Sequence, residues 1–183
     1  MGTTSSDSPP WFALRVKSNC EKMVANGIRY KGFEEFLPLY RSSHRWSDRI
    51  KPVELPLFPG YVFCRLDPRH RLAVLTIPGV LDFVGIGRAP MPIEDAEIAA
   101  IQQLVHSPVP AEPWEYLDRG QLVRVEAGPL AGFEGILIES RNQCRVAVSV
   151  TILKRSVAVE IDRDWIKPLG ASGLQLKLRY LVQ

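Results

Sequence analysis

The spacing of hydrophobic and polar positions changes along the chain, and each change marks an expected element. Residues 11–17 begin as an apolar run and turn polar at the end, which indicates a strand. Ser18 and Glu21 then have the spacing of a capping box, so a helix should begin here. Its buried face would consist of Cys20, Met23, Val24 and Ile28. Gly32 is a suitable end for this helix.

Extended segments follow on both sides of a polar stretch. Residues 36–40 and 50–57 carry a strand signal, and residues 41–49 between them are mostly polar. Residues 61–66 are almost entirely aromatic, β-branched or otherwise apolar, which predicts a strong strand.

Two more helices are expected before the composition changes. Asp67 followed by Pro68 predicts a helix start with proline at its first position, and Pro78-Gly79 would close this helix. A short strand over residues 80–84 precedes a third helix, which has an acidic first turn and His106 in its last turn. The acidic residues are Glu94, Asp95 and Glu97, and the buried face would be Ile98, Ile101 and Val105. This order of elements predicts an α+β domain over residues 10–105.

The chain changes character after residue 105. Three prolines within residues 108–113 indicate an extended linker over residues 106–118, so the flanking parts are expected to move independently. Residues 119–169 contain four or five short alternating runs punctuated by glycines, which predicts a small all-β barrel. The β-branched runs at 146–152 and 157–161 favour strands over helix. Residues 1–9 and 170–183 are read as tails.

Composition narrows the class of protein. The 183 residues are 46% hydrophobic and 23% charged, which is typical of a globular chain, and no apolar run is long enough for a membrane span. An odd cysteine count of three and a start without a secretory signal favour a reducing cytoplasm. The net charge of +3 is mild, but nine Lys/Arg against four Asp/Glu lie between Arg15 and Lys51. That region is the candidate polyanion-facing surface.

Catalytic chemistry has no visible basis in the sequence. His44, His70 and His106 are widely separated, and the chain has no HExxH or CxxC spacing, no phosphate-binding loop and no GxSxG. We therefore expect no enzyme activity, no metal site and no cofactor.

Two segments are more informative. In residues 55–63, prolines 56 and 59 bracket Phe58, and Gly60 precedes a strand, which predicts a stiff loop that presents Phe58. The alternative is that Phe58 only fills a core. Residues 120–135 contain Gly128-Pro129-Leu130-Ala131-Gly132, which by itself could be an ordinary turn in a barrel.

Together these segments resemble the NusG family of bacterial transcription elongation factors. Residues 58–62, Phe-Pro-Gly-Tyr-Val, match the main motif of the family's N-terminal NGN domain, and residues 120–135 match the KOW motif of its SH3-like barrel. Trp11-Phe12 and the later runs at 148–150 and 157–161 also fit. Leu57-Phe58-Pro59 followed by Asp67-Pro68 is most similar to the specialised RfaH- and UpxY-like paralogues, although His70-Arg71-Leu72 departs from the His-Thr-Thr-type segment of those proteins.

The resemblance implies a monomeric cytoplasmic factor, free of membranes, that binds the clamp of RNA polymerase and suppresses pausing and termination. The residues that would face the clamp are Trp11, Phe12, Phe58, Pro59 and Tyr61. Strand alternation turns neighbours to opposite faces, so some of these should be core, Phe12 and Tyr61 first.

The resemblance also implies contact with the non-template DNA strand. The candidates are Lys17, Arg41, His44, Arg45, Trp46 and Arg49, with Trp46 able to stack on an unpaired base. A solvated hairpin with no partner is the alternative.

The KOW barrel would recruit a termination factor or a small-subunit ribosomal protein. The candidates are Gly128, Gly132, Phe133 and Ile136, of which the last two could equally fill the barrel core. A competing function is that of an RNA- or ribosome-binding KOW module that does not act on polymerase.

Overall fold

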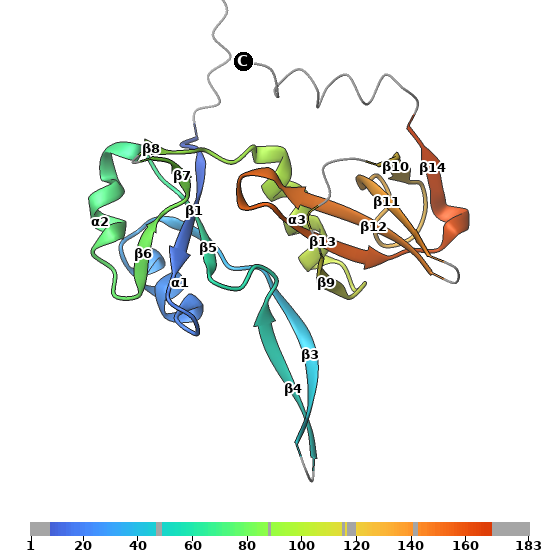
Figure 1. Cartoon of the computed structure of the whole chain (residues 1–183), viewed down its shortest axis with the longest axis horizontal. Coiled ribbons are helices and arrows are strands. Elements are labelled where there is room, and N and C mark those ends of the chain that lie inside the picture. Colours follow the sequence, from blue (N-terminus) through green and yellow to red (C-terminus); the bar gives the residue numbers. More distant parts are fainter. Residues whose placement is uncertain are drawn as a thin grey trace, which may run out of the picture.

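Antiparallel sheets dominate both halves of the chain (Figure 1). The computed structural model describes residues 8–46, 49–87, 89–114, 116, 120–140 and 143–169, and leaves out the side chains of residues 43–52, 139, 140 and 143. Among the described residues, no helix has the length and apolar character needed to cross a membrane.

A four-stranded sheet with the order β2-β5-β1-β6 forms the N-terminal half. Its strands are β1 (Trp11–Val16), β2 (Glu34–Phe36), β5 (Tyr61–Arg65) and β6 (Val80–Phe83). The helices α1 (Glu21–Tyr30), η1 (Pro68–His70) and α2 (Arg71–Leu75) occur between these strands. Phe12, Leu14 and Val62 of the sheet share an apolar cluster with Val24 and Val74 of the helices, so α1 and α2 cover one face of the sheet.

The start of α1 differs from the expected capping box. The helix begins at Glu21, and its N-cap, Cys20, makes no side-chain capping bond. Ser18 lies too early, because Asn19 has a φ of 62° and turns the chain before the helix starts. Glu21 is buried in place of Met23, which is half exposed, so the predicted apolar face was wrong at that position.

A long hairpin replaces the predicted polar stretch. Strands β3 (Leu39–Trp46) and β4 (Arg49–Pro56) pair along their whole length, and Figure 1 shows the hairpin extending away from both halves. The extended segment predicted at 50–57 agrees with β4, whereas the polar composition of residues 41–46 concealed most of β3, because neither face of the hairpin needs to be apolar outside a core. A second, short hairpin joins β7 (Gly85–Ile86) to β8 (Ala89–Pro90).

The C-terminal half is a six-stranded antiparallel sheet with the order β14-β10-β11-β12-β13-β9. Its strands are β9 (Ala111–Trp114), β10 (Leu122–Val125), β11 (Glu134–Ser140), β12 (Gln143–Val150), β13 (Arg155–Glu160) and β14 (Ile166–Pro168), with short helices η2 (Thr151–Leu153) and η3 (Arg163–Trp165). Strands β12 and β13 confirm the prediction from the β-branched runs. Residues 111–114, predicted as linker, form an edge strand, where Pro113 is tolerated because one row of N–H groups is unpaired.

Helix α3 (Asp95–His106) joins the halves and packs against β12. Its buried residues are Ile98, Ile101 and Leu104, with Leu104 taking the position predicted for Val105. These residues share one apolar cluster with Trp11 and Phe58 of the N-terminal half and Val146 and Phe133 of the C-terminal half. The halves are therefore docked, in contrast to the independent motion expected from the proline-rich segment.

Candidate functional site

A row of aromatic rings lies on the face of the N-terminal sheet opposite α1 and α2. Trp11 meets Phe36 edge-on at 6.5 Å between ring centroids, and Phe36 stacks on Phe63 at 6.0 Å. Phe58 meets Phe63 edge-on at 5.5 Å. These geometries are the favourable ones for aromatic pairs, so the row is a preorganised apolar surface.

The turn that carries Phe58 is held at three points. The Tyr61 amide donates to the Phe58 carbonyl at 3.1 Å, and the Val16 amide of β1 donates to the Gly60 carbonyl at 2.9 Å. Gly60 has a φ of 82°, which strongly favours glycine. Its amide donates to the carboxylate of Glu21, a side chain only 8% exposed, at 2.9 Å. Glu21 thus fixes the turn to the start of α1.

The five predicted clamp-facing residues divide between the two faces of the sheet. Trp11 and Phe58 lie in the aromatic row, and Tyr61 is half-buried against the same cluster. Pro59 is exposed at the turn. Phe12 points to the opposite face, where its ring meets Phe83 edge-on at 5.9 Å. Strand alternation therefore removes Phe12 from this surface.

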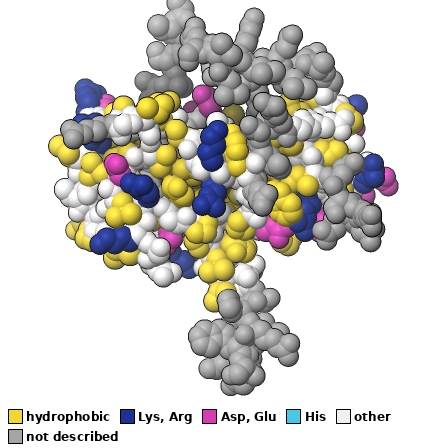
Figure 2. Space-filling model, viewed as in Figure 1, with side chains coloured by type: hydrophobic (Ala, Val, Ile, Leu, Met, Phe, Trp, Pro, Cys, Tyr) yellow, Lys and Arg dark blue, Asp and Glu magenta, His cyan; other side chains and the backbone are white. Residues whose placement is uncertain are grey.

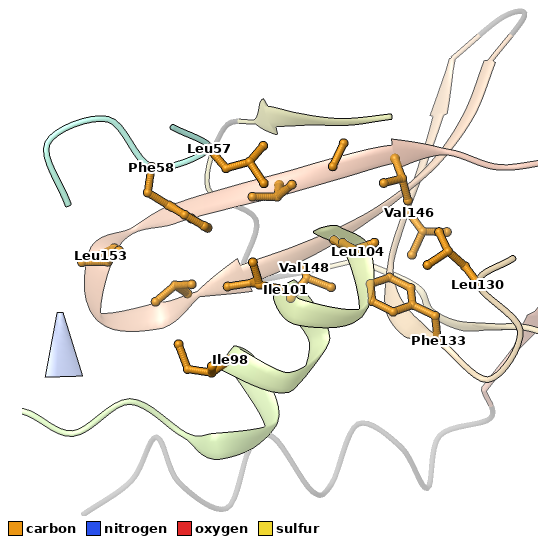
Figure 3. Close-up of a cluster of buried hydrophobic side chains, with 14 of the residues drawn as sticks. Leu57, Phe58, Ile98, Ile101, Leu104, Leu130, Phe133, Val146, Val148 and Leu153 are labelled. Atoms are coloured by element: carbon orange, nitrogen blue, oxygen red, sulfur yellow. The ribbon is translucent and has the colours of Figure 1, made fainter. Parts of the chain in front are cut away.

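The C-terminal half covers this surface. Trp11 and Phe58 are 3% and 1% exposed. Figure 3 shows Leu57 and Phe58 on one side of the β12–β13 hairpin and α3 on its other side. A polar contact lies beside this apolar packing, since the Thr151 hydroxyl donates to the Glu97 carboxylate at 2.7 Å.

Arg65 organises one end of the aromatic row, a role that the sequence did not indicate. Its guanidinium carbon lies 5.2 Å from the centre of the Trp11 ring. The same group contacts Glu34 of β2 at 3.5 Å and Asp95 of α3 at 3.0 Å. The sequence could have indicated this role of Arg65 only if the pairing of β1 with β5, which places Arg65 opposite Trp11, had been known.

The predicted DNA-facing residues gather on the long hairpin, apart from Lys17. Lys17 is exposed after β1 and Arg41 is exposed on β3. The backbones of His44, Arg45 and Trp46 lie in β3 and that of Arg49 in β4, and their side chains fall outside the description. Figure 2 shows Lys and Arg side chains scattered among other types on the body of the molecule, so the described side chains on this face form no single basic patch.

The predicted partner-binding turn of the C-terminal half begins after β10. Gly128 and Gly132 have φ angles of 77° and 85°. Phe133 and Ile136, the apolar candidates, are buried. In this arrangement Phe133 and Ile136 fill the core, as the alternative interpretation held, whereas Gly128 and Gly132 are exposed.

Asp67 and Cys64 have strongly shifted pKa values. Asp67 confirms the predicted helix start, since its carboxylate accepts from the Arg69 amide at 2.9 Å. Hydrogen bonds from the Arg69 side chain, and then from its amide, lower the pKa of Asp67 to about 2. Burial raises the pKa of the Cys64 thiol to about 12, which disfavours a nucleophilic role. Among the described residues, no group of three potential metal ligands comes together.

Comparisons with known proteins converge on one family. Residues 9–102 match the family model described as transcription termination factor NusG. The transcription termination/antitermination protein NusG of Thermus thermophilus is 31% identical over 83% of this chain and 94% of its own length. The protein of the same name from Escherichia coli K12 is 30% identical over 83% and 92%.

A solved structure supports the fold. The structure titled "Domain interaction in Thermotoga maritima NusG" covers 87% of this chain and 97% of that chain, with a TM-score of 0.52 and 23% identity.

Proposed function

Because this chain belongs to the NusG family of transcription termination/antitermination proteins, we propose that it binds RNA polymerase through its N-terminal half and suppresses pausing and termination. The family consists of transcription factors rather than enzymes, which fits a chain whose sequence carries no catalytic motif. The cytoplasm is the compartment in which such a bacterial factor would work.

The aromatic row is the observation that carries this proposal. Large rings on rigid supports bury much area and lose little side-chain freedom on binding, so a few of them can dominate an interface. Trp11, Phe58 and Tyr61 meet this description, with Pro59 at the edge of the surface. Because the C-terminal half covers the row, polymerase binding requires the two halves to separate.

Two further contacts belong to the same proposal. The β3–β4 hairpin, with Arg41 and the predicted residues of its tip, would touch the non-template strand, since it extends away from the body (Figure 1). The turn between Gly128 and Gly132 would meet a termination factor or a small-subunit ribosomal protein once the halves are apart.

A matched pair of tyrosine variants tests polymerase binding in the full chain. Tyr61→Ala removes a half-buried ring beside the aromatic row, whereas Tyr30→Ala removes a ring that is 94% exposed at the far end of α1. We expect Tyr61→Ala to weaken binding to core RNA polymerase and to reduce read-through of a strong pause, with Tyr30→Ala unchanged. Phe58→Ala is less suitable, because emptying a fully buried site costs about 3–5 kcal/mol of folding free energy.

The competing function makes the opposite prediction. A ribosome- or RNA-binding KOW module would sediment with ribosomal subunits, ignore Tyr61→Ala and leave polymerase pausing unchanged. That result would refute the proposal.

A further inference from the structure

The covalent connection between the docked halves is much shorter than the sequence suggests. Helix α3 ends at His106 and β9 begins at Ala111, so only residues 107–110 join an N-terminal element to the C-terminal sheet. Four extended residues reach at most roughly 14 Å. While β9 stays paired, the C-terminal sheet therefore remains close to the end of α3.

Backbone pairing alone holds β9 weakly. It is four residues long and lies at the edge of the sheet, and within the described part of the chain it pairs with β13 alone, from Ala111 opposite Val159 to Trp114 opposite Ser156. Pro113 has no N–H to donate. Short edge strands interrupted by proline are easily detached.

Side chains from the neighbouring strands supply the rest of the attachment. Arg145 of β12 contacts the Glu112 carboxylate at 2.8 Å, and its guanidinium carbon lies 4.7 Å from the centre of the Trp114 ring. Arg145 lies opposite Glu160 in the register, so its side chain reaches diagonally across β13 to Glu112, which lies opposite the small side chain of Ala158. Lys154 similarly lies 4.6 Å from the centre of the Tyr116 ring.

We propose that β9 is a detachable clasp whose release sets how far the two halves can separate. Arg145 holds β9 itself to the C-terminal sheet, and Lys154 holds Tyr116, two residues beyond the strand. With β9 detached, the connection runs over residues 107–121 and can extend to roughly 50 Å. The effect of the clasp on polymerase binding rests on the proposed function, because the aromatic row becomes accessible only when the C-terminal sheet moves away.

Variants on both sides of the clasp test this proposal in the full chain. Arg145→Ala and Trp114→Ala should both speed hydrogen exchange at the β9 amides severalfold and increase the maximum dimension measured by small-angle X-ray scattering. Arg145→Lys keeps a cation near Trp114 and should restore part of the protection. Arg124→Ala is the matched control, because Arg124 pairs with Glu134 on β10 and β11 and should change neither measurement.

Two results would overturn the clasp. The first is faster exchange in β9 with an unchanged maximum dimension, which would place the hinge elsewhere. The second is no change in exchange with either Arg145→Ala or Trp114→Ala. Polymerase affinity is measured separately: opened variants that still do not bind polymerase would support the clasp and refute the proposed function.

Discussion

At the scale of single residues, two glycines of one turn differ in what surrounds them. Gly128 and Gly132 both have positive φ angles, at 77° and 85°. A methyl group at Gly128 would lie 2.3 Å from a ring carbon of Trp165, whereas nothing lies within 4 Å of the same position at Gly132. The two positions therefore separate backbone strain from steric clash.

We predict that Gly132→Ala lowers the free energy of unfolding by about 1–2 kcal/mol, the cost of a left-handed conformation for an alanine. Gly128→Ala should cost about 1–3 kcal/mol more, because the Trp165 ring must move. Chemical denaturation of the two variants measures the difference. Equal destabilisation would show that Trp165 does not pack against Gly128.

The residues of the site were only partly predictable from the sequence. Trp11, Phe58 and Tyr61 were found because they belong to recognisable motifs. Glu21 and Arg65 were missed, since Glu21 fitted a local capping pattern and instead accepts a hydrogen bond from Gly60, 39 residues away. Local patterns cannot distinguish a helix cap from a long-range contact when the same carboxylate suits both.

At the scale of elements, the start of the second helical segment depends on one carboxylate. Asp67 caps η1, which leads directly into α2, and its pKa is held near 2 by Arg69. Because the folded pKa is below the ordinary value near 3.8, the stabilising contribution is present above about pH 4 and disappears as pH falls towards 2.

We predict that the amide resonance of Arg69 shifts with a midpoint near pH 2 in an NMR titration. Asp67→Asn keeps an oxygen acceptor for the amide and should abolish this titration. A midpoint near the ordinary value would mean that the Arg69 side chain does not engage Asp67 in solution.

Elements with a strong apolar period were predictable, and polar or edge strands were not. Residues 61–66 and the β-branched runs of β12 and β13 indicated their strands because burial imposes the pattern. Most of β3, and all of β9, carry no such pattern, although residues 50–57 did indicate β4. Their strand structure comes from pairing with a neighbouring strand, which a single segment does not reveal.

At the scale of the whole molecule, docking of the two halves was not predictable. The proline-rich segment indicated separation, but Ile98, Ile101 and Leu104 of α3 connect the aromatic row to the apolar face of the C-terminal sheet. An apolar residue looks the same in the sequence whether it fills its own domain or a shared core. In the docked structure the aromatic row is part of the core shared by the two halves, and the same row is the proposed polymerase-binding surface.

Polymerase and the C-terminal half should compete for the aromatic row, and one binding titration tests this competition. Core RNA polymerase is titrated with the full chain, with Tyr61→Ala, and with Thr151→Ala, which removes the 2.7 Å hydroxyl contact to Glu97 between the halves. A hydrogen bond worth about 0.5–1 kcal/mol predicts that Thr151→Ala binds about two- to fivefold more tightly than the unchanged chain, and Tyr61→Ala more weakly. Equal affinity of all three proteins, or weaker binding by Thr151→Ala, would show that polymerase and the C-terminal half do not compete for the aromatic row.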